Sequence, residues 1–345
     1  MLKVLHLPYN IGNQSWGLSR AERKIGIKSD HLVFLNNKFG YRFDINLNLQ
    51  NYWFLKRYYL RFLYLFKSIK EYDIFHFYFK KTFLPFYLDL IIIKLFRKKI
   101  FFTFQGSDIR KKSIPFGNKN NQETIKFDYL KTIKFDYLKT IGLLFIKLFA
   151  NGTFVLNPDL LLISPNSNFS YYSSVNISKI KYSYTSYITG KKFKIIHAPS
   201  NRDIKGTKFI ISAINKLKKD YPFIMLELIE NVPNNEVLRR AQGAHLAIDQ
   251  LKIGWYGGFA VEMMAQGLPV MCYLNEELLD YLNFKKDIPI IIADPDTCYI
   301  EIKKILENYT KLIKISKLSR EYVEKYHNPI TNAEIIKQEY QNAFK

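Results

Sequence analysis

A segment in the last third of the chain combines a glycine turn, a helix start and a carboxylate. Residues 249–270, DQLKIGWYGGFAVEMMAQGLPV, lead from an expected strand end through a Gly-Gly turn into a short helix. Such a turn exposes backbone N–H groups at the positive end of the helix dipole, which suits a phosphate. We expect phosphate contacts from four consecutive amides, those of Gly257, Gly258, Phe259 and Ala260. Glu262 lies about one turn into the helix, where its carboxylate can accept hydrogen bonds from ribose hydroxyls.

The second half of this segment resembles the donor-nucleotide site of retaining GT-B glycosyltransferases. The signature of that family has a glutamate, seven residues and a second glutamate, and it ends in a small residue, glycine, any residue, proline and valine. Glu262, residues 264–265, Gly267 and residues 269–270 match the second half. The resemblance implies that Glu262 holds the ribose of a nucleotide-sugar.

The first glutamate of the signature is absent, because the position eight residues before Glu262 is Gly254. Asp249, Lys252 or nearby backbone amides could contact the donor sugar instead. Two interpretations follow from this departure. One is an active transferase, and the other is a sugar-nucleotide-binding partner subunit with little or no catalysis.

A second segment matches the same family. Residues 194–207, KIIHAPSNRDIKGT, are expected to form a buried strand, a turn and a helix start. In the family the corresponding loop carries an arginine and a lysine that clamp the diphosphate, which implies this role for Arg202 and Lys205. Cations suit it because the leaving diphosphate gains negative charge in the transition state. The resemblance also implies that the backbone of Val232 meets the base, and it implies no metal and no cofactor besides the donor, a UDP- or GDP-sugar.

The first half of the chain offers candidates for the acceptor side. Gly12 lies in a loop after the first expected strand and would allow close backbone approach to the donor and acceptor. Residues 102–110, FTFQGSDIR, resemble a strand-end element of the family in which Gln105 replaces the usual histidine. Asp108 is a candidate catalytic base or, alternatively, a helix N-cap. With Arg110 it would border the acceptor cleft.

Strands and helices are expected to alternate along the chain. The expected strands are 2–7, 31–35, 74–77, 100–104, 153–156, 160–163, 193–197, 223–227, 245–248, 270–273 and 288–292, and the expected helices include 53–70, 84–96, 208–218, 235–242 and 258–266. Alternation implies parallel sheets wrapped by helices. We therefore expect an α/β protein with the GT-B architecture, in which two Rossmann-like, doubly wound parallel-sheet domains face a central cleft.

The expected domain boundaries follow the composition. Residues 1–170 would form the acceptor-binding domain, 171–191 a polar linker rich in tyrosine and serine, and 192–330 the donor-binding domain. The last helix, 331–345, would cross back to the first domain, as in the family. An exact tandem copy of TIKFDYLK at residues 124–139 is interpreted as a duplication in a surface insertion or as a lid.

Composition narrows the function classes. Two cysteines, Cys272 and Cys298, provide neither a disulfide framework nor metal-ligand spacing, which predicts a reducing compartment. The chain has no signal-like start and no run of about 18 apolar residues. We expect a cytoplasmic protein that is soluble or peripheral on the inner face of the membrane.

The positive charge is concentrated in the first half. Residues 1–200 hold 32 of the 52 lysines and arginines but only 11 of the 30 acidic residues, so they carry nearly all of the formal charge of +22. In the expected helix 53–70, cations such as Arg57, Arg61 and Lys67 are interspersed with aromatic and aliphatic side chains. This pattern suits an anionic membrane surface, or an ordinary amphipathic helix with a solvated basic face. Nucleic acid is not expected as a partner, because the chain has no recognisable RNA- or DNA-binding motif.

Together these features predict a glycosyltransferase that moves a sugar, with retention of configuration, from a nucleotide-diphospho-sugar to a glycan or a lipid-linked acceptor. The expected setting is the assembly of bacterial surface polysaccharide or lipo-oligosaccharide.

Overall fold

The computed structural model describes residues 1–345 apart from 37–38, 112–128, 185–191, 283 and 285–286, and for residues 129–135 it describes the backbone only. The described chain forms two compact units. The first unit consists of residues 1–111, 129–174 and 329–345, and the second consists of residues 175–328.

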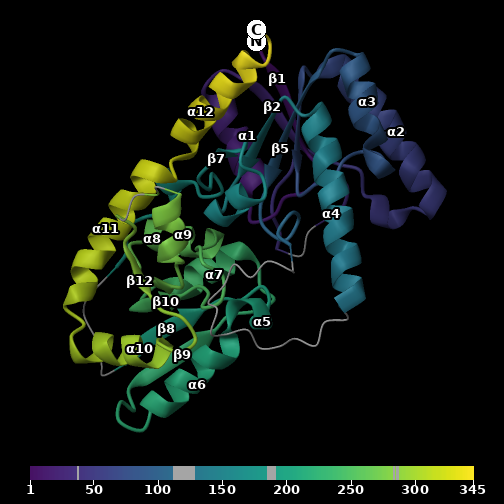
Figure 1. Ribbon diagram of the computed structural model, residues 1–345. Coiled ribbons are helices and arrows are strands. Elements are labelled where there is room, and N and C mark those ends of the chain that lie inside the picture. Colours follow the sequence, from purple (N-terminus) through teal and green to yellow (C-terminus); the bar gives the residue numbers. More distant parts are fainter. Residues whose placement is uncertain (37–38, 112–128, 185–191, 283, 285–286) are drawn as a thin grey trace. The chain divides into compact units, whose positions relative to one another are not determined.

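The first unit contains a seven-stranded sheet in which every strand pair is parallel (Figure 1). The strand order is β3-β2-β1-β4-β5-β6-β7. The strands are β1 Lys3–Leu7, β2 Lys28–Val33, β3 Ile45–Asn46, β4 Ile74–Tyr78, β5 Lys99–Phe104, β6 Gly152–Val155 and β7 Asn168–Phe169.

Helices cover both faces of this sheet because the strands are apolar on both sides. The helices are α1 Gln14–Lys24, α2 Phe54–Glu71, α3 Leu88–Leu95, α4 Tyr129–Phe149 and α12 Pro329–Asn342, with 3-10 turns η1 Leu49–Asn51, η2 Pro85–Tyr87 and η4 Pro158–Leu162. Val4 of β1 packs in one apolar cluster with residues of α1 and α12. Leu5, its neighbour on the opposite face, packs in the cluster formed with α2, α3 and α4. This alternation gives the doubly wound arrangement.

A buried polar network joins the C-terminal helix α12 to the first sheet. Tyr340 of α12 hydrogen bonds through its hydroxyl to Nδ1 of His76, at 2.5 Å, and Nε2 of His76 contacts the hydroxyl of Thr103 at 2.7 Å. Burial lowers the pKa of His76 well below its usual range, so the ring is neutral. His76 is therefore a core residue.

One predicted strand is wrong. Residues 160–163 form no strand, because the 3-10 turn η4 spans Pro158–Leu162. Pro158 has no N–H for a ladder, and Asp159 is held by the guanidinium of Arg110 at 2.7 and 3.0 Å. Leu160 is buried nonetheless, so its apolar character reflects packing rather than a strand.

The second unit contains a five-stranded parallel sheet with the order β12-β11-β10-β8-β9. The strands are β8 Phe193–His197, β9 Ile224–Leu228, β10 Leu246–Ile248, β11 Val270–Cys272 and β12 Ile290–Ile292. The helical elements are η5 Ile177–Lys179, α5 Arg202–Lys205, α6 Thr207–Leu217, α7 Asn234–Ala241, α8 Gly258–Ala265, α9 Glu276–Tyr281, α10 Cys298–Glu307 and α11 Lys311–Tyr326. The expected pair of parallel α/β sheets is confirmed.

Candidate functional site

The carboxyl ends of β8 and β10 bring a lysine, an aspartate and a glycine together. Asp249, just after β10, is buried, and its Oδ1 accepts a hydrogen bond from Nζ of Lys205 at 2.6 Å. Its Oδ2 accepts from the backbone N–H of Gly257 at 2.6 Å. One carboxylate therefore positions both the lysine of α5 and the start of α8. Open α/β sheets bind their ligands at this edge.

The start of α8 is open to a ligand. Gly257 is the extended N-cap residue, and no side chain caps the helix. The first N–H groups of an α-helix have no partner within the helix, so the amides of Gly258, Phe259 and Ala260 are available to an anion. A Cβ at Gly257 would lie 3.3 Å from Nζ of Lys205, which is tighter than ordinary contact. Glycine at this position thus lets Lys205 approach the helix start.

Glu262 lies beside the loop that follows β9. Its Oε1 accepts a hydrogen bond from Nδ2 of Asn234 at 2.8 Å. Burial raises the pKa of Glu262 to about 7, with a further increase from the negative charge of Asp249 and an opposing effect of the Asn234 hydrogen bond. Val232 is half-buried two residues before Asn234, in the same loop. The second unit therefore gathers the predicted ribose and base contacts around one loop and one helix.

Arg202 is placed differently from Lys205. Its side chain is 57% exposed, and its guanidinium pairs with the carboxylate of Glu230 at 2.5 and 2.9 Å. A surface pair of this kind contributes only about 0–1 kcal/mol. Arg202 could therefore exchange Glu230 for a diphosphate at little cost, whereas Lys205 is already directed at the helix start.

The structure explains why Gly254 carries no side chain. A Cβ at this position would lie 2.5 Å from Cβ of Asn275 and 3.2 Å from its backbone nitrogen. The backbone N–H of Asn275 donates to the carbonyl of Gly254 at 3.1 Å, and the Asn275 side chain caps α9. The missing glutamate is thus replaced by a close backbone packing contact, and this loop has no room for a side chain there.

His197 is buried behind this site and serves the fold. Its Nδ1 lies 2.7 Å from the carbonyl of Ile248 and its Nε2 lies 2.9 Å from the hydroxyl of Thr207. Burial lowers its pKa to about 4, so the ring is neutral, donating to the carbonyl and accepting from the hydroxyl. Both ring nitrogens are used in holding β8, β10 and α6 together.

The predicted acceptor residues lie in the first unit. Gly12 has a φ of 58°, in the left-handed region that favours glycine, and no atom lies within 4 Å of a Cβ placed there. Asp108 is buried, and its carboxylate accepts from the backbone N–H groups of Gln105, at 3.2 Å, and Gly106, at 2.8 Å. Burial raises the pKa of Asp108. Asp108 therefore closes the turn after β5. It is not a helix N-cap, because no α-helix begins there among the described residues.

The sequence did not reveal the roles of two residues at the candidate site. One was not recognised, and the other was given a different role. Asn234, which contacts Glu262, had only its position after a strand as a signal. Asp249 was considered as a donor-sugar contact, but both of its oxygens are engaged by Lys205 and Gly257. Within the described ranges, no three His, Cys, Asp or Glu side chains gather to hold a metal ion.

Neither a protein-family model nor a curated protein matches this sequence, but solved structures do. A sucrose-phosphate synthase from Thermosynechococcus elongatus is 13% identical, with a TM-score of 0.65 and 99% of each chain covered. HepE from Anabaena, solved with UDP-glucose, is 11% identical, with a TM-score of 0.63 and coverage of 99% of this chain and 100% of that chain. A UDP-GlcNAc 2-epimerase from Neisseria meningitidis, bound to UDP-GlcNAc, is 12% identical, with a TM-score of 0.51 and 99% of each chain covered. The chain therefore has a GT-B glycosyltransferase-like fold, which sugar transferases and these epimerases share.

The raised pKa of Glu262 predicts a pH dependence of nucleoside binding. An ionised carboxylate accepts hydrogen bonds more strongly than a neutral carboxyl group, so ribose should bind better once Glu262 has lost its proton. Affinity for uridine or guanosine, which carry no titrating phosphate, should rise roughly tenfold between pH 6 and pH 8 and level off above. Calorimetry at three pH values measures this, and Glu262→Gln should flatten the profile. An unchanged slope in that variant would assign the titration to another group.

Proposed function

We propose that this chain is a retaining glycosyltransferase that moves a sugar from a UDP- or GDP-sugar to a glycan or lipid-linked acceptor, in the assembly of bacterial surface polysaccharide or lipo-oligosaccharide. The observation that carries the proposal is the cluster at the carboxyl edge of the second sheet. There Lys205, the uncapped start of α8 and Glu262 offer a cation, free amides and a ribose acceptor.

Each part of the donor would meet one part of this cluster. Lys205, the amides of residues 258–260 and Arg202 would hold the diphosphate and stabilise the charge that develops as it leaves. The amide of Gly257, which the sequence also suggested, donates to Asp249 instead. Glu262 would accept from the ribose, and the backbone of Val232 would meet the base. The acceptor would assist the departure of the diphosphate on the same face of the sugar, so this mechanism requires no protein nucleophile. The cations would neutralise the leaving diphosphate in place of a metal.

The second candidate is a sugar-nucleotide-binding partner subunit without catalysis. The packing of Asn275 against Gly254 favours it, because the position that carries a glutamate in the family has no space for one. Incubating the purified chain with a panel of UDP-, GDP- and CMP-sugars separates the candidates. Binding together with donor hydrolysis or transfer supports the enzyme, and binding alone supports the subunit. A 2-epimerised sugar product would contradict both.

We further propose that the first unit works at the inner face of the cytoplasmic membrane. Helix α2 exposes apolar side chains along its first half and beyond, namely Trp53 just before it, Phe54, Leu55, Tyr59, Phe62 and Leu63. Lys56, Arg57 and Lys67 are exposed on the same helix. Apolar side chains among cations suit an anionic bilayer. Within the described chain, no helix is long and apolar enough to span a membrane.

Arg61 is not part of this exposed basic face. Its guanidinium donates to the carbonyl of Thr82 at 3.0 Å and lies 4.9 Å from the ring centres of Phe34 and Tyr58. The helix therefore divides its cations between the surface and the interior of the unit.

Replacing Lys56, Arg57 and Lys67 by Gln should weaken binding to anionic vesicles. Each surface cation near the bilayer contributes up to about 1 kcal/mol, so the triple variant should lose roughly tenfold or more at low salt. Cosedimentation with anionic and neutral vesicles, at low salt and at about 0.5 M salt, measures the effect.

A matched control removes three exposed lysines from the second unit, Lys216, Lys218 and Lys219, and should leave vesicle binding unchanged. If the wild-type protein ignores anionic vesicles at low salt, the membrane proposal fails. An acidic soluble glycan would then be the better partner for the basic half.

A further inference from the structure

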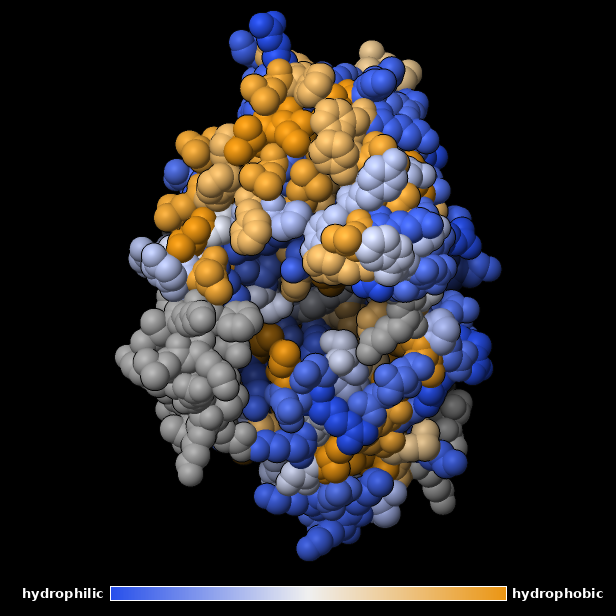
Figure 2. Space-filling model, turned by 90° about the vertical axis from the view of Figure 1, so that its right-hand side faces the viewer, coloured by the Kyte–Doolittle hydropathy of each residue, from blue (hydrophilic) through white to orange (hydrophobic). Residues whose placement is uncertain are grey.

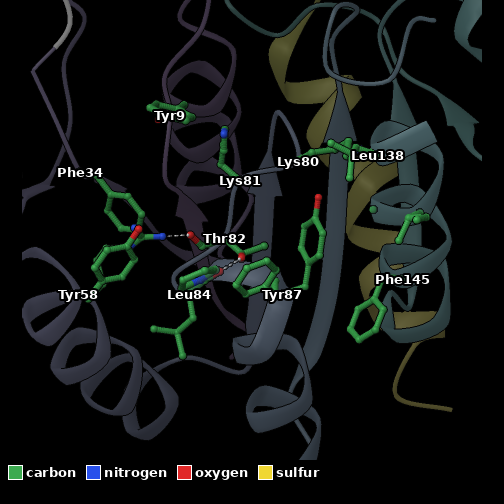
Figure 3. A pocket seen from close by; sticks show the side chains of 15 residues that line it. Tyr9, Phe34, Tyr58, Lys80, Lys81, Thr82, Leu84, Tyr87, Leu138 and Phe145 are labelled. Carbon is green, nitrogen blue, oxygen red and sulfur yellow. Dashed lines mark hydrogen bonds between the residues drawn. The ribbon is translucent and has the colours of Figure 1, made fainter. Parts of the chain in front are cut away.

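The first unit contains a pocket of about 620 Å³ that none of the functions above uses. Its walls come from the loops after β1, β2 and β4, from α2, from η2 and from α4. The residues that line it include Tyr58, Arg61, Lys80, Lys81, Leu138 and Ile141. Figure 3 shows Phe34 and Tyr58 on one side, Leu138 and Phe145 on the other, and Thr82 and Tyr87 between them. A pocket of this size can enclose a drug-sized ligand.

The charge of the lining is one-sided, because it includes three cations and no carboxylate. Arg61 is held in place by two aromatic rings and a backbone carbonyl, as described above. Nζ of Lys80 donates to the carbonyl of Lys139 at 2.8 Å. Burial lowers the pKa of Lys80 to about 8, with help from the charges of Lys139 and Lys81 and against the opposing charge of Asp108. Positive charge gathered in this way favours an anionic ligand group.

The backbone around these cations is unusual. Four non-glycine residues have left-handed φ angles, namely Phe79 at 57°, Lys80 at 52°, Phe86 at 54° and Tyr87 at 60°. Such backbone conformations are unfavourable for residues with a side chain, and they tend to persist at ligand sites. Gly142 adds to this, because a Cβ there would lie 2.7 Å from Oη of Tyr87 and 3.1 Å from Nζ of Lys80. A glycine inside α4 thus lets that helix close against the charged side of the pocket.

The rest of the lining is apolar and continues onto the surface. Leu138 and Ile141 of α4 line the pocket and are also 56% and 43% exposed, and Phe86 is 84% exposed. Beyond them the exposed apolar side chains of the neighbouring helices are Leu88, Ile91, Leu95 and Phe96 around α3 and Tyr137, Leu144 and Leu148 on α4. This is the hydrophobic surface seen in Figure 2. An apolar surface of this kind marks a binding site on a protein.

We propose that the pocket binds the phosphate of a phosphate-bearing membrane lipid and that the hydrocarbon chain of the lipid lies along α4. The cations Arg61, Lys80 and Lys81 recognise the phosphate, and the apolar lining with the adjoining surface recognises the chain. The statement that this lipid carries the acceptor rests on the proposed function. It agrees with the position of Tyr9, which lines the pocket and lies in the same loop as Gly12. The binding of the lipid does not depend on that role.

Calorimetry on the full chain tests the proposal with three probes: dodecyl phosphate below its micelle concentration, inorganic phosphate and dodecyl maltoside. Dodecyl phosphate should bind at least tenfold more tightly than either of the others, because only it satisfies both the cations and the apolar wall. Lys81→Gln, in an exposed loop, should weaken dodecyl phosphate about tenfold, the scale of one lost charged hydrogen bond. Arg61→Gln should do the same. Lys70→Gln removes an equal charge from α2 outside the pocket and should have no effect.

Three outcomes would overturn the lipid site. Inorganic phosphate that binds as tightly as dodecyl phosphate would leave only an anion site. Dodecyl maltoside that binds equally well would leave only an apolar groove. An equal loss of affinity for dodecyl phosphate in Lys70→Gln would show that diffuse surface charge, rather than the pocket, attracts the ligand. Nucleotide binding by the second unit, measured on the same samples, separates this result from the proposed function, since each can fail while the other stands.

Discussion

Replacing Arg202 and Lys205 together by Ala is expected to lower donor turnover by roughly 10²–10³-fold, the effect of removing a group that stabilises developing transition-state charge. The affinity for a nucleoside without phosphates should change little, because the contribution of the two cations grows with charge on the diphosphate. Hydrolysis of the donor sugar-nucleotide and calorimetry with the nucleoside measure the two effects on one preparation.

Controls separate this chemistry from damage to the fold. Lys205 also partners the buried carboxylate of Asp249, so its loss disturbs the start of α8. Arg202→Ala alone removes only an exposed pair and should retain part of the effect on turnover. Lys216→Ala with Lys219→Ala removes the same charge from two exposed positions, one at the end of α6 and one just after it, and should change nothing. Equal losses for nucleoside and sugar-nucleotide would point to destabilisation of the second unit.

Glu262→Ala is expected to weaken nucleotide binding about 10- to 150-fold, which corresponds to about 1.5–3 kcal/mol for a lost charged hydrogen bond. The fold should survive, because the side chain of Glu262 is only half-buried and its partner Asn234 lies at a helix start that water can reach. Equilibrium binding of UDP and GDP, with thermal unfolding of the same samples, checks both parts. The matched control is Glu277→Ala on the exposed side of α9, which should bind like the wild type.

The order of apolar and turn-forming residues along the chain was enough to predict most of the fold. Buried apolar runs ending in turn residues predicted β8 and β10, and the Gly-Gly turn predicted α8 to within one residue. The segment at residues 160–163 shows the limit of this reasoning, because a short apolar run fits a strand and a buried 3-10 turn equally well. What decided between them was the contact of Asp159 with Arg110, far away in the sequence.

The candidate site, too, could be predicted only in part from the sequence. The types and spacing of Lys205, Gly257 and Glu262 could be recognised along the chain. The role of Asp249 could not, because it depends on two partners that only the folded sheet brings to the same carboxylate. The contact between Gly254 and Asn275 and the inward position of Arg61 likewise arise from tertiary packing.

We propose that the second unit binds a nucleotide-sugar through Glu262 and the start of α8. The most direct test is calorimetric titration of the purified full chain with UDP, GDP and CMP and their sugars, for the wild type, Glu262→Ala and Glu277→Ala. We expect saturable binding of a UDP or GDP ligand by the wild type and by Glu277→Ala, and at least tenfold weaker binding by Glu262→Ala. Equal affinity in all three proteins, or no binding of any nucleotide by the folded wild type, would contradict it.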